Sequence, residues 1–271
     1  MNYQTFKPHP YLESFVHCYW TLEVPAEDDA QKQRIIPDGC IEMAFILGDD
    51  IKRYTSEEEF TLQPRAMIIG QTIEPFYIQP TGYVNTFAIR FYPYGFASFI
   101  SESLQNFVNK EIPLHLVFGE AIANELEQKM IKANDTKERI AFIEKFLFDK
   151  LSDKITVNKI VNNTIDTLLS TQGDAKINNI LKQNLCSRRQ LERKFSEQIG
   201  ISPKQLAKVI RLQAALKILL NEETDSLTNI AYKSKYYDQS HFVKDFKKFT
   251  GMSPKEFLGN KNMALSSLLY K

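Results

Sequence analysis

The chain has 271 residues, of which 43% are hydrophobic and 25% are charged. These values are ordinary for a folded protein, and the length fits about two domains, so a disordered or collagen-like chain is excluded. No apolar run approaches the ~18 residues of a membrane-spanning helix, and no signal-peptide pattern opens the chain. We therefore expect a cytoplasmic protein with no membrane contact. Three widely separated cysteines, Cys18, Cys40 and Cys186, indicate neither a disulfide framework nor a zinc site with four cysteines.

The net charge of +1 hides an uneven distribution along the chain. Residues 1–150 contain 14 basic and 22 acidic side chains, a net charge of −8, whereas residues 151–271 contain 20 and 11, a net charge of +9. A basic module of this kind favours a polyanionic partner such as nucleic acid. A chance distribution of charge is the alternative.

The first hundred residues predict short β-strands. Turn-forming residues, such as those at 37–39, separate apolar or aromatic runs at 41–47, 65–70, 75–79 and 85–92. Strands this short and closely spaced favour a sandwich or barrel. Beyond about Tyr94 the pattern changes, and amphipathic helices are predicted over 118–130 and 136–151.

After Leu151 the pattern is helical throughout. Val157, Val161, Ile165 and Leu168 have the spacing of one helix face, and Asp174 is a candidate N-cap for a helix over 175–182. We place a domain boundary near Ser152 and Asp153. The predicted fold class is α+β: residues 1–152 form a β-rich barrel or sandwich with C-terminal helices, and residues 153–271 form an all-helical domain.

The strongest signal is an internal repeat in the basic half. Residues 187–206 (SRRQLERKFSEQIGISPKQL) align with 238–257 (DQSHFVKDFKKFTGMSPKEF) at an offset of 51. Upstream, residues 177–181 resemble 227–231 at an offset of 50. The difference between the two offsets predicts one extra residue in the turn of the second copy.

Each copy of the repeat predicts a helix-turn-helix unit. Ser187 and Asp238 are candidate N-caps, and Gly200 and Gly251 stand where a glycine would end a helix. Ser-Pro-Lys-Gln and Ser-Pro-Lys-Glu then begin the next helix, with serine as the N-cap and proline at the first helical position. Apolar residues between Leu206 and Leu220 predict one long helix that joins the two copies.

The polar face of each predicted recognition helix carries residue types that read bases in the major groove. Arginine pairs with guanine, glutamine pairs with adenine, and glutamate accepts from cytosine. The candidates for base contacts are Arg188, Arg189, Glu192, Arg193, Gln239, Ser240, His241 and Lys244. A solvated charged face is the alternative for either helix alone, but two copies in one basic domain favour nucleic-acid binding.

Residues 186–206 and 236–257 resemble the two halves of the DNA-binding domain of AraC/XylS-type transcription regulators. The resemblance covers about residues 155–258. It implies seven helices and two helix-turn-helix units that enter successive major grooves. By position it implies phosphate contacts at Ser187, Lys204, Lys208, Lys247 and Lys255. Where the family commonly has glycine before each recognition helix, this chain has Leu185 and Lys235, at which a positive φ costs roughly 1 kcal/mol.

The N-terminal half resembles the sensing domain of the same family, in a subgroup with a cupin-like β domain. The segments that carry this resemblance are RIIPDGCIEMAFILG, MIIGQTIEP and FAIRFYPYGFASFI. They imply effector binding or dimerisation through this half, and the effector and its binding residues stay unknown. RNA polymerase, a small-molecule effector and a second copy of the chain are therefore candidate partners.

The sequence predicts a transcription regulator and not an enzyme. It would read a bipartite site on double-stranded DNA, with recognition helices about 34 Å apart. The four histidines, His9, His17, His115 and His241, are scattered, and no catalytic or nucleotide-binding motif occurs, so we expect no catalytic residue, metal or cofactor. Most of the aromatic residues Trp20, Tyr77, Phe87, Phe91 and Tyr92 are interpreted as core, with the lining of a ligand pocket as the alternative.

Three other functions stay open from the sequence. A sequence-indifferent architectural DNA binder would show salt-dependent binding without a sequence motif. A cupin-type metalloenzyme with a basic appendage would bind a stoichiometric metal. A ligand-independent regulator would use its first domain for protein contacts alone.

Overall fold

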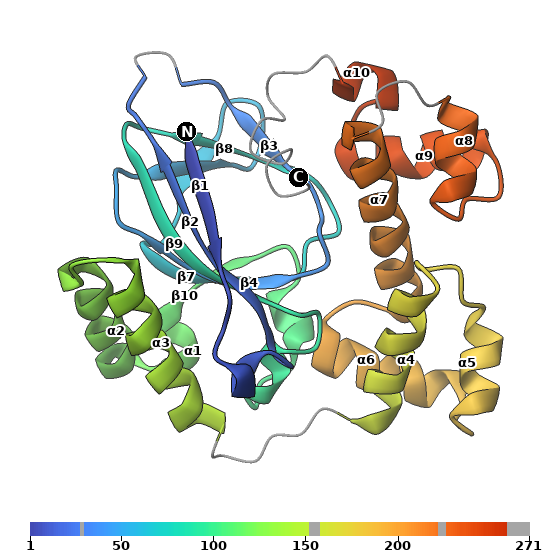
Figure 1. Cartoon of the computed structure of the whole chain (residues 1–271), viewed down its shortest axis with the longest axis horizontal. Coiled ribbons are helices and arrows are strands. Elements are labelled where there is room, and N and C mark those ends of the chain that lie inside the picture. Colours follow the sequence, from blue (N-terminus) through green and yellow to red (C-terminus); the bar gives the residue numbers. More distant parts are fainter. Residues whose placement is uncertain (28–29, 152–157, 222–225, 259–271) are drawn as a thin grey trace.

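The structure, a computed structural model, describes residues 1–27, 30–151, 158–221 and 226–258. Its N-terminal domain contains two antiparallel sheets (Figure 1). The larger has the order β1 (Asn2–Phe6), β2 (Val16–Val24), β9 (Val84–Phe91), β4 (Ile41–Ile46), β7 (Ala66–Ile69) and β10 (Glu111–Pro113). The smaller has the order β3 (Gln33–Ile35), β8 (Phe76–Pro80), β5 (Ile51–Tyr54) and β6 (Phe60–Leu62). The four predicted strands are confirmed as β4, β7, β8 and β9.

The larger sheet buries both of its faces, and the alternation of side chains along each strand decides which residues face which layer. On β4, Ile41, Met43 and Phe45 belong to the main core. Ala44 and Ile46, on the opposite face, pack in a second cluster that includes Ile51 of the smaller sheet. Helices cover the first face, and the smaller sheet covers the second.

The helices on the outer face are α1 (Leu114–Phe118), α2 (Glu120–Lys132) and α3 (Thr136–Leu151). The prediction of a helix over 136–151 is confirmed. The prediction of one helix over 118–130 was wrong at its start, because Gly119, with φ of 85°, separates α1 from α2. Of the five aromatic residues of which most were interpreted as core, Phe87 and Phe91 are fully buried beneath these helices, whereas Trp20, Tyr77 and Tyr92 are half-buried. The core interpretation was therefore right for two of the five.

Seven helices follow in the part of the C-terminal half that is described. They are α4 (Lys159–Ser170), α5 (Ile177–Gln183), α6 (Arg188–Ile199), α7 (Pro203–Asn221), α8 (Leu227–Lys233), α9 (Gln239–Thr250) and α10 (Pro254–Leu258). One core gathers around Phe195 and a second around Phe246, and α7 contributes to both through Leu206 and Leu216. The predicted long helix between the two copies is therefore confirmed.

Two further predictions concern the start of this domain. The boundary at Ser152 and Asp153 lies outside the described residues, as does Val157. The prediction of Asp174 as an N-cap was wrong, since α5 begins at Ile177 with Lys176 at the N-cap position. The backbone N–H of Asp174 donates instead to the carbonyl of Thr171, which prolongs the turn that closes α4.

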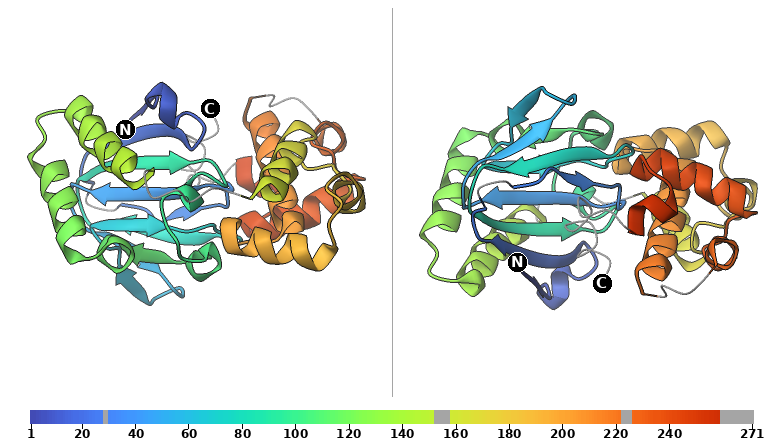
Figure 2. Two further views of the ribbon diagram at one scale, coloured as in Figure 1. Left: turned by 90° about the horizontal axis from the view of Figure 1, so that it is seen from below. Right: turned by 90° about the horizontal axis from the view of Figure 1, so that it is seen from above.

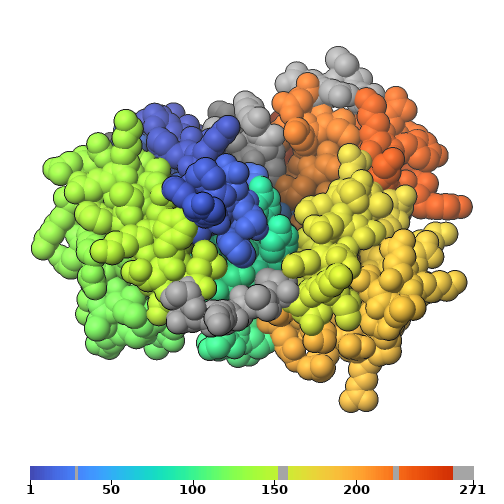
Figure 3. Space-filling model, turned by 60° about the horizontal axis from the view of Figure 1, so that its bottom comes forward, coloured from blue at the N-terminus to red at the C-terminus, as the bar shows by residue number. Residues whose placement is uncertain are grey.

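The β-sheets lie between α1–α3 on one side and the helical domain on the other (Figures 1 and 2). The two domains are in contact (Figure 3). Ile36 of the β domain belongs to the core around Phe246, and Val108 packs against the core around Phe195. Both helix-turn-helix units therefore rest on the β domain. No helix among the described residues is long and apolar enough to cross a membrane.

Candidate functional site

Both recognition helices begin with the side-chain caps that the repeat predicts. The Ser187 hydroxyl accepts from the backbone N–H of Gln190 at 3.2 Å, and the Asp238 carboxylate accepts from that of His241 at 2.7 Å. These bonds satisfy amides that have no partner within the helix. The local sequence therefore fixes where α6 and α9 begin.

The helices that follow the recognition helices begin with reciprocal capping boxes. Ser202 and Gln205 exchange bonds at 2.9 and 3.2 Å, and Ser253 and Glu256 do so at 2.7 and 3.4 Å. In each pair the backbone N–H of one residue donates to the side chain of the other. The predicted serine caps are confirmed in both copies.

Residues with positive φ bracket both recognition helices. Gly200 and Gly251, with φ of 91° and 76°, end α6 and α9 as predicted. Leu185 and Lys235, with φ of 48° and 63°, occupy the positive-φ turns where the family commonly has glycine. The loop between α8 and α9 is also one residue longer than the loop between α5 and α6, as the two offsets predicted.

All eight candidates for base contacts are exposed on the first three turns of α6 and α9. The first residue of each helix is held by the preceding helix. Arg188 Nη2 donates to Asn178 Oδ1 at 3.1 Å, and Thr228 Oγ1 donates to Gln239 Oε1 at 2.7 Å. Asn178 and Thr228 occupy equivalent positions of the repeat, and the alignment at an offset of 50 was the signal that could have identified them.

Surface ion pairs connect the arginines of α6 to glutamates one helical turn later. Arg193 Nη1 lies 2.9 Å from Glu197 Oε1, and Arg188 Nη1 lies 3.9 Å from Glu192 Oε1. Exposed pairs of this spacing contribute about 0.3–0.5 kcal/mol. Both arginines can therefore exchange their carboxylate partner for a base or a phosphate at little cost.

The candidates for phosphate contacts fall into two groups. Ser187, Lys204, Lys247 and Lys255 are exposed. Lys208 instead has a partner inside the protein, since its Nζ lies 2.8 Å from Asp245 Oδ1. The Asp245 side chain is 6% exposed, and its other oxygen lies 3.6 Å from His241 Nε2. Asp245, which joins α9 to α7, was not among the residues predicted from the sequence.

A cavity of about 350 Å³ lies between the two sheets of the N-terminal domain. Most of its wall is apolar, with Leu22, Ile46, Met67 and Ile78 among the lining residues. Trp20 also lines it, so this aromatic residue of the predicted set is part of a pocket and not of the closed core. The volume lies within the usual range for small-molecule sites.

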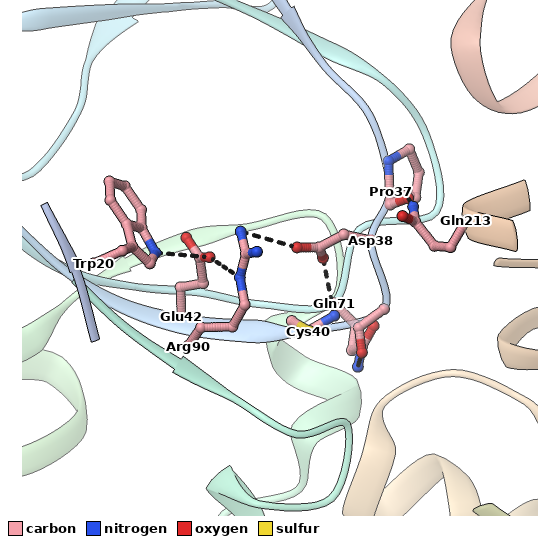
Figure 4. Close-up of polar contacts among 9 residues, drawn as sticks. Trp20, Pro37, Asp38, Cys40, Glu42, Gln71, Arg90 and Gln213 are labelled. Atoms are coloured by element: carbon pink, nitrogen blue, oxygen red, sulfur yellow. Dashed lines mark hydrogen bonds and ion pairs between the residues drawn. The ribbon is translucent and has the colours of Figure 1, made fainter. Parts of the chain in front are cut away.

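One end of the cavity is charged (Figure 4). Arg90 Nε donates to Glu42 Oε1 at 2.7 Å, and Arg90 Nη2 lies 3.4 Å from Asp38 Oδ2. Trp20 Nε1 donates to the same Glu42 oxygen at 3.2 Å. Arg90 and Glu42 are directly opposed on β9 and β4, so the strand register brings their charges together.

The pKa values at this end reflect burial and mutual attraction. Burial raises the pKa of Glu42, although Arg90 partly opposes the shift. Burial acts against the charge on Arg90, but Glu42 and Asp38 outweigh it and raise the pKa of Arg90 well above its usual value. Burial also raises the pKa of Tyr3, at the same end, to about 12. The guanidinium is therefore a permanent charge shared by two carboxylates.

Metal binding has no support in the part of the chain that is described. Among residues 1–27, 30–151, 158–221 and 226–258, no three histidine, cysteine, aspartate or glutamate side chains gather as metal ligands would. The three cysteines, Cys18, Cys40 and Cys186, are in the thiol form.

Comparison with known proteins separates the same two parts of the chain. Residues 4–113 match a family described as a domain of unknown function, DUF6597, and residues 182–260 match a family described as a helix-turn-helix domain. The chain is 30% identical over 115 residues to an uncharacterised HTH-type transcriptional regulator of Haemophilus influenzae. It is 37% identical over 71 residues to the HTH-type transcriptional regulator MtrA of Neisseria gonorrhoeae.

These matches to curated relatives are partial. They cover 42% and 26% of this chain, and 37% and 23% of the respective relatives. The chain thus matches well under half of the length of either relative.

A solved structure extends the likeness to both domains. ToxT from Vibrio cholerae has a TM-score of 0.50 at 13% identity, covering 97% of this chain and 100% of that one. A second ToxT structure, bound to (E)-4-(8-methylnaphthalen-1-yl)but-3-enoic acid, also has a TM-score of 0.50, at 15% identity, covering 96% and 99%. At this identity the likeness shows a shared fold.

Proposed function

We propose that this chain, whose C-terminal part is a helix-turn-helix domain of the AraC type, is a sequence-specific DNA-binding transcription regulator. The observation that carries the proposal is the pair of matched helix-turn-helix units joined by α7. Each unit exposes base-reading side chains at the start of its recognition helix. A solvated surface would not require the same caps, turns and exposed face twice.

We propose that the two domains have different functions. The helical domain, residues 153–271, reads the DNA, and the β-rich domain, residues 1–152, senses an effector or mediates dimerisation. The recognition helices α6 and α9 enter successive major grooves about 34 Å apart, so that one chain reads a bipartite site. The eight exposed candidates contact bases, and Ser187, Lys204, Lys247 and Lys255 contact phosphates.

The cavity favours a ligand-dependent regulator over a ligand-independent one. A domain used only for protein contacts has no need of a cavity of about 350 Å³ with a charged end. ToxT, which shares the fold, has been solved with a small organic acid bound. We propose that the effector of this chain occupies the cavity between the sheets. RNA polymerase and a second copy of the chain complete the proposed set of partners, in the cytoplasm.

Selection of DNA from a random pool tests the proposed function. The full chain at about physiological salt should enrich a motif with two halves about one helical turn apart. Salt-sensitive binding without any enriched motif would identify an architectural DNA binder instead. Absence of DNA binding, together with a stoichiometric metal in elemental analysis, would support the metalloenzyme alternative.

A further inference from the structure

The charges that line the cavity are unbalanced. Among the described lining residues Arg90 is the one basic side chain, whereas Asp38, Glu42 and Glu27 are acidic. Arg90 is already paired with two carboxylates, and its side chain is only 9% exposed. With both carboxylates ionised, the group of Arg90, Asp38 and Glu42 carries one negative charge that no partner in the group compensates, in a largely apolar cavity.

Glu42 offers a hydrogen-bond acceptor at the charged end of the cavity. Both bonds that Glu42 accepts, from Arg90 and Trp20, end on Oε1, which leaves Oε2 without a hydrogen bond to any described residue. The side-chain oxygen of Gln33, another lining residue, is buried and has no partner in the described part of the chain. A ligand that donates a hydrogen bond would satisfy Glu42 Oε2.

Aromatic rings stand beside this negative charge. Tyr3 and Trp20 both line the cavity, with their ring centroids 6.0 Å apart and their planes inclined by 45°. Their faces favour a cation, because the quadrupole of an aromatic ring is negative above the ring plane.

We propose that the cavity binds a small molecule with an apolar body and one protonated amine, which sits against Glu42 and Asp38. An organic anion would meet two carboxylates and gain only a guanidinium that they already share. A protonated amine would compensate the excess charge and donate to Glu42 Oε2. This inference rests on the proposed function, since it names the chemical class of the effector.

Asp38 connects the charged end of the cavity to the DNA-binding domain through a series of contacts (Figure 4). Asp38 lies in the loop between β3 and β4, where its Oδ1 accepts from the backbone N–H of Cys40 at 2.9 Å. The same loop rests on α7, since Gln213 Nε2 donates to the Pro37 carbonyl at 2.5 Å. A Cβ on Gly39 would lie 3.3 Å from Val209 Cγ1, so the loop has little room to move without moving α7.

A ligand that competes with Arg90 for Asp38 therefore binds next to Pro37, whose carbonyl accepts the hydrogen bond from Gln213 of α7. Because α7 contributes to the cores of both helix-turn-helix units, a change at this contact reaches α6 and α9 together. Occupancy of the cavity and the placement of the recognition helices are coupled through residues 37–39.

The binding test uses three probes with one apolar body: phenylbutylamine, phenylbutanol and phenylbutyrate. The chain has a single tryptophan, and Trp20 lines the cavity, so its fluorescence reports binding directly. We expect the amine to bind about tenfold more tightly than the acid, with the alcohol between them. Acid binding that equals or exceeds amine binding would overturn the proposal, as would the absence of any fluorescence change.

The variant Glu42→Gln removes the negative charge of Glu42 while keeping the size of the side chain, so it tests whether charge determines the affinity for the amine. It keeps an acceptor for Trp20 and removes the excess negative charge, so the amine should lose about tenfold in affinity and the acid should gain. The matched control is Glu23→Gln, an exposed carboxylate on β2 outside the cavity, which should leave the order of the probes unchanged. If Glu42→Gln weakens the binding of all three probes equally, the charge of Glu42 does not determine the preference for the amine. If this variant does not fold, the order of the three probes on the unaltered chain still tests the proposal.

The coupling is tested by DNA affinity with and without phenylbutylamine. We expect the amine to change the affinity several-fold, and Gln213→Ala to bind the amine while losing this change. An unchanged DNA affinity despite amine binding would overturn the coupling. A chain that binds the amine but no DNA would contradict the proposed function alone, so the two failures are distinguishable.

Discussion

The two helix-turn-helix units share one scaffold but anchor their recognition helices differently. In the first unit, Arg193 pairs with Glu197 on the surface of the same helix. In the second, the buried Asp245 pairs with Lys208 of α7. The position of the repeat that is equivalent to Asp245 is occupied by Lys194 in the first unit. Caps and glycines therefore define the shared scaffold, whereas, among the described residues, an ion pair between the recognition helix and α7 occurs in the second unit and not in the first.

The largest expected effect comes from removing that tie. Asp245→Ala leaves the Lys208 ammonium, which is 25% exposed, without its partner, and should cost about 2–4 kcal/mol of unfolding free energy. The equivalent change in the first unit, Lys194→Ala, should cost less than about 0.5 kcal/mol. Urea denaturation of both variants measures the difference, and equal losses would show that the two units are anchored alike.

The next effect concerns base reading. Arg193→Ala should cost about 1–3 kcal/mol on the selected DNA site and relax its specificity at one position, because the arginine leaves its weak surface pair for a base. Lys244→Ala, at the equivalent position of the second unit, is the matched variant. Titration against selected and random DNA provides the measurement. Equal loss on both DNAs would assign the residue to phosphate contact.

The salt dependence of binding distinguishes the lysines. Lys204→Ala and Lys255→Ala, at equivalent exposed positions, should each lower the slope of log affinity against log salt concentration by about one. Lys208→Ala should leave the slope nearly unchanged and lower the melting temperature, because its charge is already compensated by Asp245. If Lys208→Ala lowers the slope by about one, Lys208 contacts a phosphate after all.

The smallest expected effect is stabilising. Leu185 and Lys235 hold positive φ angles, and the Leu185 side chain is 93% exposed, so it loses no burial on removal. Leu185→Gly and Lys235→Gly should each raise the unfolding free energy by up to about 1 kcal/mol. Thermal unfolding checks this expectation, and a lower melting temperature for both variants would show that the strain is relieved in another way.

Features set by local sequence were predictable, and those set by register or long-range pairing were not. The caps at Ser187 and Asp238 and the glycines at 200 and 251 depend on neighbouring residues, and the repeat presents them twice. The pair of Glu42 and Arg90 depends on how β4 and β9 align across 48 residues, which periodicity alone does not fix. Asp174 is an exception among the local features: its backbone N–H donates to the Thr171 carbonyl, and α5 begins only at Ile177.

The same distinction between local and long-range features applies to the residues of the candidate site. The exposed faces of α6 and α9 followed from helical spacing, so all eight candidates for base contacts lie at the surface. Asp245 was missed because a buried carboxylate needs a partner from α7 that sequence spacing does not reveal. The sequence raised a ligand pocket only as the alternative for five aromatic residues, of which Trp20 lines the cavity. The other lining residues come from strands of both sheets, and sequence spacing does not bring them together.

Methylation interference on the selected DNA tests the central claim most directly, namely that one chain reads two successive major grooves. Guanines whose methylation blocks binding of the full chain should form two clusters about one helical turn apart on one face of the duplex, with one chain bound per site. Arg193→Ala should erase signals in one cluster and leave the other intact. A single cluster, or a symmetric pattern that requires two chains, would contradict the claim.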